Sequence, residues 1–193
     1  MKVYSIFLAC LLLAPSLPLA AADPVEVKIG LLNPLTGPIA DFAPGFTDAA
    51  EVAIAELNEI YDGDYEFELV EADSGCDGTT AASSTQSLID HGVVGIAGAA
   101  CSGATLGAID VAMDAEVPMI SYASTSPVIT DYDDDDYLFR VVPSDAQQAQ
   151  AMASVAYSAG FRNPAVVHIT DDYSVGMANA FVNEWYYEMD EDY

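Results

Sequence analysis

The sequence has 193 residues, of which 52% are apolar, and it carries 31 acidic residues against 4 basic ones. The apolar content excludes a disordered chain, and a formal net charge of −27 opposes binding to nucleic acid or to an anionic membrane surface. Because the acids are spread along the chain, we expect them to coat a folded surface, which is typical of halophilic proteins adapted to high salt.

The first 22 residues predict a secretory signal peptide. Lys2 supplies a positive charge, residues 3–14 form an apolar run, and three alanines at 20–22 resemble a cleavage site. The run is too short to cross a membrane, and Cys10 within it lies too near the start for lipid attachment. We therefore expect a protein that is secreted to the periplasm or the outer face of the cell membrane, with no transmembrane segment in its mature part.

Short apolar strands then alternate with helices of about a dozen residues. We expect strands at residues 25–31, 67–72, 93–97 and 119–122, and helices at residues 47–60, 79–90 and 102–115. This alternation predicts βαβ units and therefore a doubly wound parallel α/β sheet, covered on both faces.

A polar break at residues 132–137 separates this first lobe, residues 23–137, from a second unit. Residues 138–145 predict an extended crossing or hinge segment. Residues 146–193 start a second lobe, with a helix at 147–158, a strand at 165–169 and a helix at 175–188. One strand cannot make a sheet, so we expect the second lobe to be incomplete within this chain.

The segments that follow the strands are rich in hydroxyl and aromatic side chains. Ligands of open parallel sheets bind beyond the carboxyl ends of the strands. Ser102 starts a helix whose free N–H groups attract a carboxylate, and residues 124–126 add three hydroxyls. Phe42 and Tyr173 would wall such a site. On these grounds alone Ser102 is equally an ordinary N-cap, and Tyr173 a packed surface aromatic.

Cys76 and Cys101 are the two cysteines of the mature chain. They follow the second and the third expected strand, which end at the same edge of a parallel sheet. In an exported protein this predicts a disulfide, which would contribute about 3 to 4 kcal/mol by restricting the unfolded chain.

Four motifs follow one another in order: Ile29 to Pro38 (IGLLNPLTGP), Asp73 to Asp77 around Cys76, Ala100-Cys101-Ser102, and Pro118 to Pro127 (PMISYASTSP). From about residue 26 to the end, the chain resembles the leucine/isoleucine/valine-binding proteins of ABC transporters. The resemblance implies a type I periplasmic-binding-protein fold whose two lobes close on a ligand. It implies capture of a branched-chain or other small amino acid, or a related amide, for a membrane permease, with no cofactor and no chemical step.

The resemblance also assigns roles to individual positions. Ser102, Ala123 and Thr125 fall where the family holds the ligand carboxylate and amine, and Phe42 and Tyr173 fall on its aromatic contacts. The family's acidic group for the ligand amine comes from later in the second lobe, beyond this chain. Phe42 also lacks a hydroxyl that is common at its place.

Other interpretations compete with this one. A ligand-binding ectodomain of a sensory receptor would share the fold. A nucleophile at Cys101 would make the chain an enzyme, but neither His91 nor His168 is placed to act as its base.

A metal site is a further alternative, and we expect none. The four adjacent carboxylates at 133–136 do not converge on one point. The run from Asp62 to Glu66 starts like a calcium loop but continues with Phe67 where that loop requires glycine.

Overall fold

The computed structural model describes residues 23–190, so the expected signal peptide and Cys10 lie outside it. Five strands form one parallel sheet in the order β2-β1-β3-β4-β5. The strands are β1 (Val25–Asn33), β2 (Tyr65–Asp73), β3 (Val93–Gly98), β4 (Met119–Ser121) and β5 (Leu138–Arg140). The sheet confirms the expected parallel α/β fold class.

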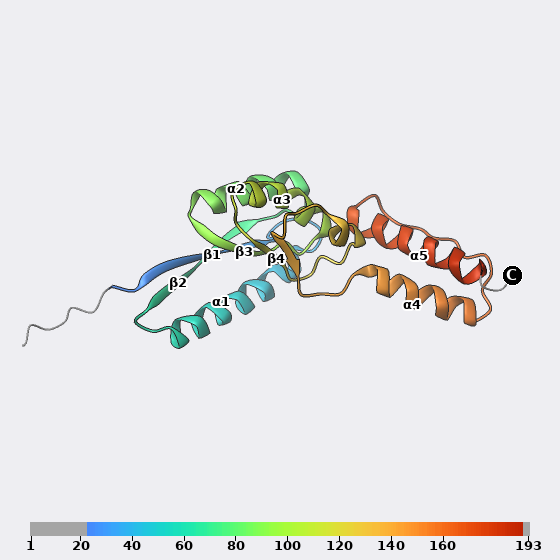
Figure 1. The fold of residues 1–193 in the computed structure, drawn as a ribbon, viewed down its shortest axis with the longest axis horizontal. Coiled ribbons are helices and arrows are strands. Elements are labelled where there is room, and N and C mark those ends of the chain that lie inside the picture. The colour runs from blue at the N-terminus through green and yellow to red at the C-terminus, as the bar shows by residue number, and fades with distance from the viewer. Residues whose placement is uncertain (1–22, 191–193) are drawn as a thin grey trace, which may run out of the picture.

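Helices cover both faces of this sheet. Figure 1 shows α2 and α3 on one face and α1 on the other, while α4 and α5 extend beyond the end of the sheet. The helices are α1 (Ala43–Ile60), α2 (Gly78–Asp90), α3 (Ser102–Asp114), α4 (Asp145–Ser158) and α5 (Asp172–Asp190), with short 3₁₀ helices η1 (Ala40–Phe42) and η2 (Pro127–Asp131). Among residues 23–190, no helix combines the length and apolarity that crossing a membrane requires.

The core lies between the sheet and the layer formed by α2 and α3. Its buried side chains come from strands β1, β3 and β4 and from helices α2 and α3. They include Leu32, Leu88, Ile96, Ile109 and Met119. Because all five strands are parallel, their carboxyl ends lie at one edge of the sheet, which positions the loops that form the candidate site.

Two helices start three or four residues earlier than the sequence predicts. Helix α1 begins at Ala43 and not at residue 47, with Pro44 in its first turn. Proline is well suited to that place, since the first turn needs no N–H donor from it. Helix α5 begins at Asp172, three residues before the predicted start at residue 175.

The predicted strand at residues 165–169 is wrong. This segment runs without strand pairing and is exposed along its whole length, with Val167 at 93% exposure. A strand needs a neighbour for its backbone hydrogen bonds, and none of the described residues supplies one. Residues 138–140, in the segment expected to cross between the lobes, form strand β5 in the sheet beside β4.

Helices α4 and α5 pack against each other beside this unpaired segment. Trp185 of α5 is 5% exposed, and its ring lies 5.8 Å from the rings of both Tyr157 and Phe181. This aromatic cluster gives the pair of helices an apolar contact of their own.

Candidate functional site

Helix α3 presents an uncapped N-terminus at the carboxyl edge of the sheet. Its N-cap residue, Cys101, makes no side-chain cap, whereas Asp77 caps α2 and Ser144 caps α4. The first amide bonded inside the helix is that of Thr105, which donates to the Cys101 carbonyl at 3.0 Å. The N–H groups of residues 102–104 therefore keep their capacity to bind an anion.

A disulfide fixes this helix end to the neighbouring loop. Cys76 and Cys101 are bonded, with their Cα atoms 5.3 Å apart, which confirms the pairing expected from their positions after adjacent strands. Since both sulfurs are in the bond, neither is a free thiol, and the nucleophile considered for Cys101 is excluded.

The loop that holds Cys76 is also anchored to the first loop through Asp73. This carboxylate accepts hydrogen bonds from the Thr36 hydroxyl at 2.6 Å and from the amides of Thr36 and Gly75 at 3.0 and 2.8 Å. Burial tends to raise the pKa of Asp73, but these hydrogen bonds together hold it below its ordinary value. The loops after β1 and β2 are thus tied together in a fixed position.

The segment after β4, residues 122–126, is held by neighbours from three directions. The Ser126 amide donates to the Ser102 hydroxyl at 3.2 Å, which joins this loop to the start of α3. The Ser124 hydroxyl donates to the Ala99 carbonyl at 3.0 Å. Arg140 of β5 donates to the Ser126 carbonyl at 2.9 Å. This network places Ala123 and Thr125 next to the N-terminus of α3.

Thr125 is bonded to the start of the second unit. Its hydroxyl donates to the Asp145 carboxylate at 2.7 Å, and its carbonyl accepts the Asp145 amide at 2.8 Å. Thr125 is half-buried, while Asp145 is almost fully buried. The two bonds attach helix α4 directly to the loop that carries the predicted ligand contacts.

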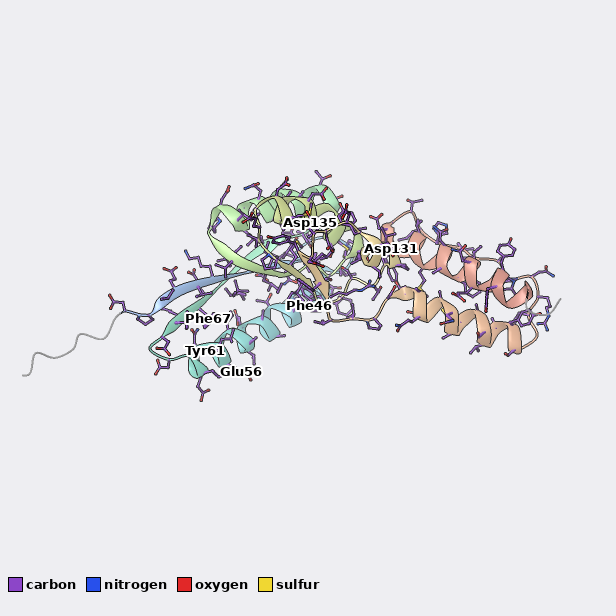
Figure 2. The ribbon with its side chains drawn as sticks, in the orientation of Figure 1. Phe46, Glu56, Tyr61, Phe67, Asp131 and Asp135 are labelled. Carbon is purple, nitrogen blue, oxygen red and sulfur yellow. A yellow bond between two sulfur atoms is a disulfide. The ribbon has the colours of Figure 1, made fainter. Side chains whose placement is uncertain are left out.

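Three aromatic rings line the same edge on the side of α1. Phe42, 64% exposed, lies 6.5 Å from Phe46, which lies 5.0 Å from Tyr122. Figure 2 shows Phe46 at the end of α1 next to the sheet. Burial, with the nearby Glu71 carboxylate, raises the pKa of the Tyr122 phenol far above its ordinary value, so the phenol stays neutral. Its hydroxyl lies 3.1 Å from Asn33 Oδ1.

The start of α5 lies over the start of α3. The Ser126 hydroxyl donates to the Asp172 carbonyl at 3.2 Å, and the Asp172 carboxylate lies where a side chain on Gly103 would extend. Ser102 is 2% exposed, and its hydroxyl accepts the Ser126 amide, so it does not face open solvent.

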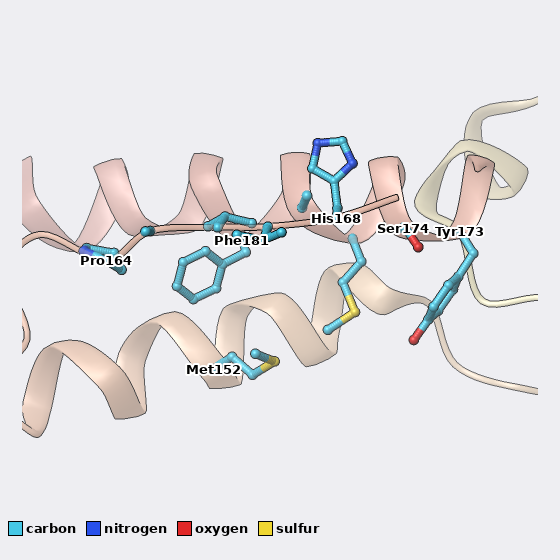
Figure 3. A pocket seen from close by; sticks show the side chains of 11 residues that line it. Met152, Pro164, His168, Tyr173, Ser174 and Phe181 are labelled. Carbon is cyan, nitrogen blue, oxygen red and sulfur yellow. The ribbon is translucent and has the colours of Figure 1, made fainter. Parts of the chain in front are cut away.

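Tyr173 lies at a hollow that Ser102 does not line. An apolar hollow of about 370 Å³ lies between α4, the unpaired segment 164–168 and α5, and Tyr173 stands at its rim. Figure 3 shows Met152, Phe181 and Tyr173 around it. The ring of Tyr173 is 44% exposed. Tyr173 follows directly after Asp172 and therefore adjoins the candidate site by its place in the chain.

The structure thus brings Ser102, Ala123 and Thr125 together through the hydrogen bonds of the loop after β4, and Phe42 approaches this loop through its ring contact with Phe46, which in turn contacts Tyr122. Sequence reasoning missed Asp145, Arg140 and Tyr122, because their partners lie far away in the chain.

Within residues 23–190, no group of three or more His, Cys, Asp or Glu residues could hold a metal ion. Asp134 bonds the Asp136 amide within its own loop.

Comparison with known proteins decides the family. The family model described as periplasmic binding protein matches residues 26–186, which is most of the chain. The chain belongs to the periplasmic binding protein family. Proteins of this family bind solutes and are not enzymes, in agreement with the absence of catalysis expected from the sequence.

Two bacterial amino-acid-binding proteins are similar to this chain along most of its length. The leucine-, isoleucine-, valine-, threonine- and alanine-binding protein of Pseudomonas aeruginosa is 30% identical over 82% of this chain and 42% of its own length. A leucine binding protein structure from Thermotoga maritima is 31% identical, with a TM-score of 0.72 over 84% of this chain and 46% of that one. The chain spans about half the length of the curated relatives it matches.

Two proteins of other kinds are also similar to the chain, one in fold and one in sequence. A Rhodopseudomonas palustris solute binding protein in complex with 4-hydroxybenzoate shares the fold, with a TM-score of 0.73 at 22% identity, over 84% of this chain and 44% of that one. The metabotropic glutamate receptor 4 of Macaca fascicularis is 34% identical over 92 residues, 48% of this chain and 10% of the receptor.

Proposed function

We propose that the chain is part of an extracytoplasmic solute-binding protein that captures a branched-chain or other small amino acid, or a related amide, for an ABC transporter. The observation that carries this proposal is the bond between the Ser126 amide and the Ser102 hydroxyl. It brings the loop of Ala123 and Thr125 to the uncapped N-terminus of α3. This arrangement offers N–H donors and hydroxyls to a carboxylate, as a small zwitterion requires.

The proposed contacts divide the ligand into a polar end and an apolar end. The Ser102 hydroxyl and the first amides of α3 would bind the carboxylate, and Thr125 with the backbone of Ala123 would bind the amine end. Phe42 and Tyr173 would pack against the rest of the ligand. Residues 23–137 would form the first lobe, residues 138–145 the crossing, and residues 146–193 the start of a second lobe. Because Asp172 lies over Gly103, entry of a ligand would require α5 to move.

Calorimetric titration with leucine, valine, glutamine and urea in molar salt tests the proposal. The protein is the full-length product of the gene, which contains any sequence that follows Tyr193. We expect at least one of these compounds to bind, and Ser102→Ala to weaken that binding by about 1 to 3 kcal/mol through loss of a charge-assisted hydrogen bond.

Ser83→Ala is the matched control, because Ser83 lies on α2 and its hydroxyl bonds only the Thr79 carbonyl among the described residues. Binding by Ser83→Ala should equal that of the unaltered protein. Equal binding by Ser102→Ala would remove Ser102 from the site, and failure of every compound to bind would contradict the proposal.

A sensory receptor ectodomain is the second candidate, favoured by the similarity to the glutamate receptor over 92 residues. A receptor would use the same ligand contacts but would connect them to a signalling segment and not to a permease. Uptake of radiolabelled ligand by cells with and without the gene separates the two. Loss of uptake on deletion supports transport, and unchanged uptake supports the receptor.

A further inference from the structure

Helix α3 has no negative charge at its own N-terminus, and the start of α5 brings one to it. Cys101 makes no side-chain cap, and the Ser102 hydroxyl accepts the Ser126 amide. The Asp172 carboxylate approaches the first turn of α3 from α5, with its Oδ2 2.7 Å from the point where a Cβ on Gly103 would stand. An uncapped helix N-terminus attracts a carboxylate through its free N–H groups and the helix dipole.

Two glycines let α5 come this close to the candidate site. Gly103 has no side chain and so leaves room for Asp172. Gly176 lies one turn further along α5, where a Cβ would stand 2.7 Å from the Ser126 hydroxyl oxygen. That hydroxyl also donates to the Asp172 carbonyl at 3.2 Å, and Figure 1 shows α5 beginning next to η2. The packing of α5 therefore holds the Asp172 carboxylate beside α3.

The neighbouring acid, Asp171, has a different partner. Its carboxylate accepts the Ser174 amide at 2.6 Å, and its carbonyl accepts the Val175 amide at 2.9 Å, as the N-cap residue of a helix does. Asp171 thus caps α5, whereas the Asp172 carboxylate approaches another helix. Both residues are exposed, so they differ in what each carboxylate faces and not in burial.

We propose that Asp172 is an internal competitor of the ligand: its carboxylate stands beside the N-terminus of α3 until a ligand carboxylate displaces it. This inference rests on the proposed function and adds a means of regulating the same site. Two carboxylates a few ångströms apart repel each other, so the ligand and Asp172 do not share this position. The contact sets a threshold, because α5 leaves α3 only for a solute that binds more favourably than Asp172 does.

Calorimetric titration of the full-length protein with an amino acid and with its C-terminal amide tests the inference, because the amide lacks the carboxylate. The pair is leucine and leucinamide, or the corresponding pair of valine or glutamine if that amino acid binds more tightly. At about 0.15 M NaCl the Debye length of about 8 Å leaves the charge contact measurable. Asp172→Asn should tighten binding of the amino acid about three- to tenfold, because attraction of Asp172 to the helix dipole and its repulsion of the ligand are both lost. Binding of the amide should stay within about twofold, or remain undetectable in both proteins.

Asp171→Asn is the matched control, because it removes one charge from the adjacent position and asparagine caps a helix as well as aspartate does. It should leave binding of the amino acid within about twofold. Asp172→Ser removes the same charge as Asp172→Asn and should give the same gain, so the test stands if one of the two variants does not fold.

A gain of less than about threefold in both Asp172 variants would overturn the inference and leave the solute-binding role intact. An equal gain in Asp171→Asn, or an equal gain for the amide, would also overturn it, because neither is expected of competition for the position beside α3. Binding of urea alone would overturn it too, since no ligand carboxylate would then enter the site. Failure of leucine, valine, glutamine and urea to bind any of these proteins would overturn the proposed function itself.

Discussion

Replacing Cys76 and Cys101 together by serine should cost stability that can be calculated from the chain. The bridge closes an interval of 25 residues. In the chain-entropy treatment, a loop of this length lowers the entropy of the unfolded chain by about 12 cal/mol/K, or about 3.5 kcal/mol at 25 °C. For a domain of this size, each kcal/mol moves the unfolding midpoint by about 2 to 4 °C, so the double variant should melt about 7 to 14 °C lower.

Urea and thermal unfolding of the oxidised protein and the double variant, followed by circular dichroism in molar salt, measure this difference. Dithiothreitol should lower the midpoint of the unaltered protein to that of the variant and leave the variant unchanged, which is the internal control. A loss below about 1 kcal/mol would refute the reasoning, because it would place most of the constraint on the loops elsewhere, for example in the Asp73 hydrogen bonds.

Two further predictions concern packing and charge. A side chain on Gly107 of α3 would overlap the backbone of Gly78 in α2, so Gly107→Ala should destabilise the protein by about 1 to 3 kcal/mol in urea titrations. Gly45 in α1 has open space around it, so Gly45→Ala should be neutral or stabilise the protein by up to about 1 kcal/mol. Equal effects of the two substitutions would contradict the close packing of α2 against α3. With a formal net charge of −27, the midpoint should rise between about 0.1 and 2 M NaCl as screening shortens the Debye length from about 10 Å to below 3 Å. Sucrose at equal osmolality, which does not screen charge, should raise it less, and a midpoint that NaCl leaves unchanged would contradict the role of charge.

The regular elements of the first lobe follow from periodicity in the sequence. Residues 93–97 and 102–115 were predicted within one residue of β3 and α3, because a short apolar run and a strong start signal leave few alternatives. The prediction failed at residues 165–169, where apolar composition favours a strand but the described residues offer no neighbouring strand. The local sequence of a segment carries no information on whether a neighbouring strand is present for it to pair with.

The sequence predicted which loop residues lie at the candidate site, but not which side chains they contact. Ser102 and Thr125 follow from the rule that strand ends carry ligands. The bond from Thr125 to Asp145 joins residues 20 positions apart, and Asp145 in the sequence looks like an ordinary residue at a helix start. The contact of Asp172 with Gly103 and Ser126 was also not predictable, because it depends on how α3 and α5, far apart in the chain, pack.

A crystal structure of the full-length protein grown with leucine tests the central claim most directly. The account predicts the leucine carboxylate at the amides of residues 102–104 and its ammonium group within hydrogen-bonding distance of Thr125 or the Ala123 carbonyl, with α5 displaced from Gly103. Leucine bound instead in the apolar hollow between α4 and α5, or a site beside Ser102 still closed by Asp172 while leucine binds elsewhere, would contradict it.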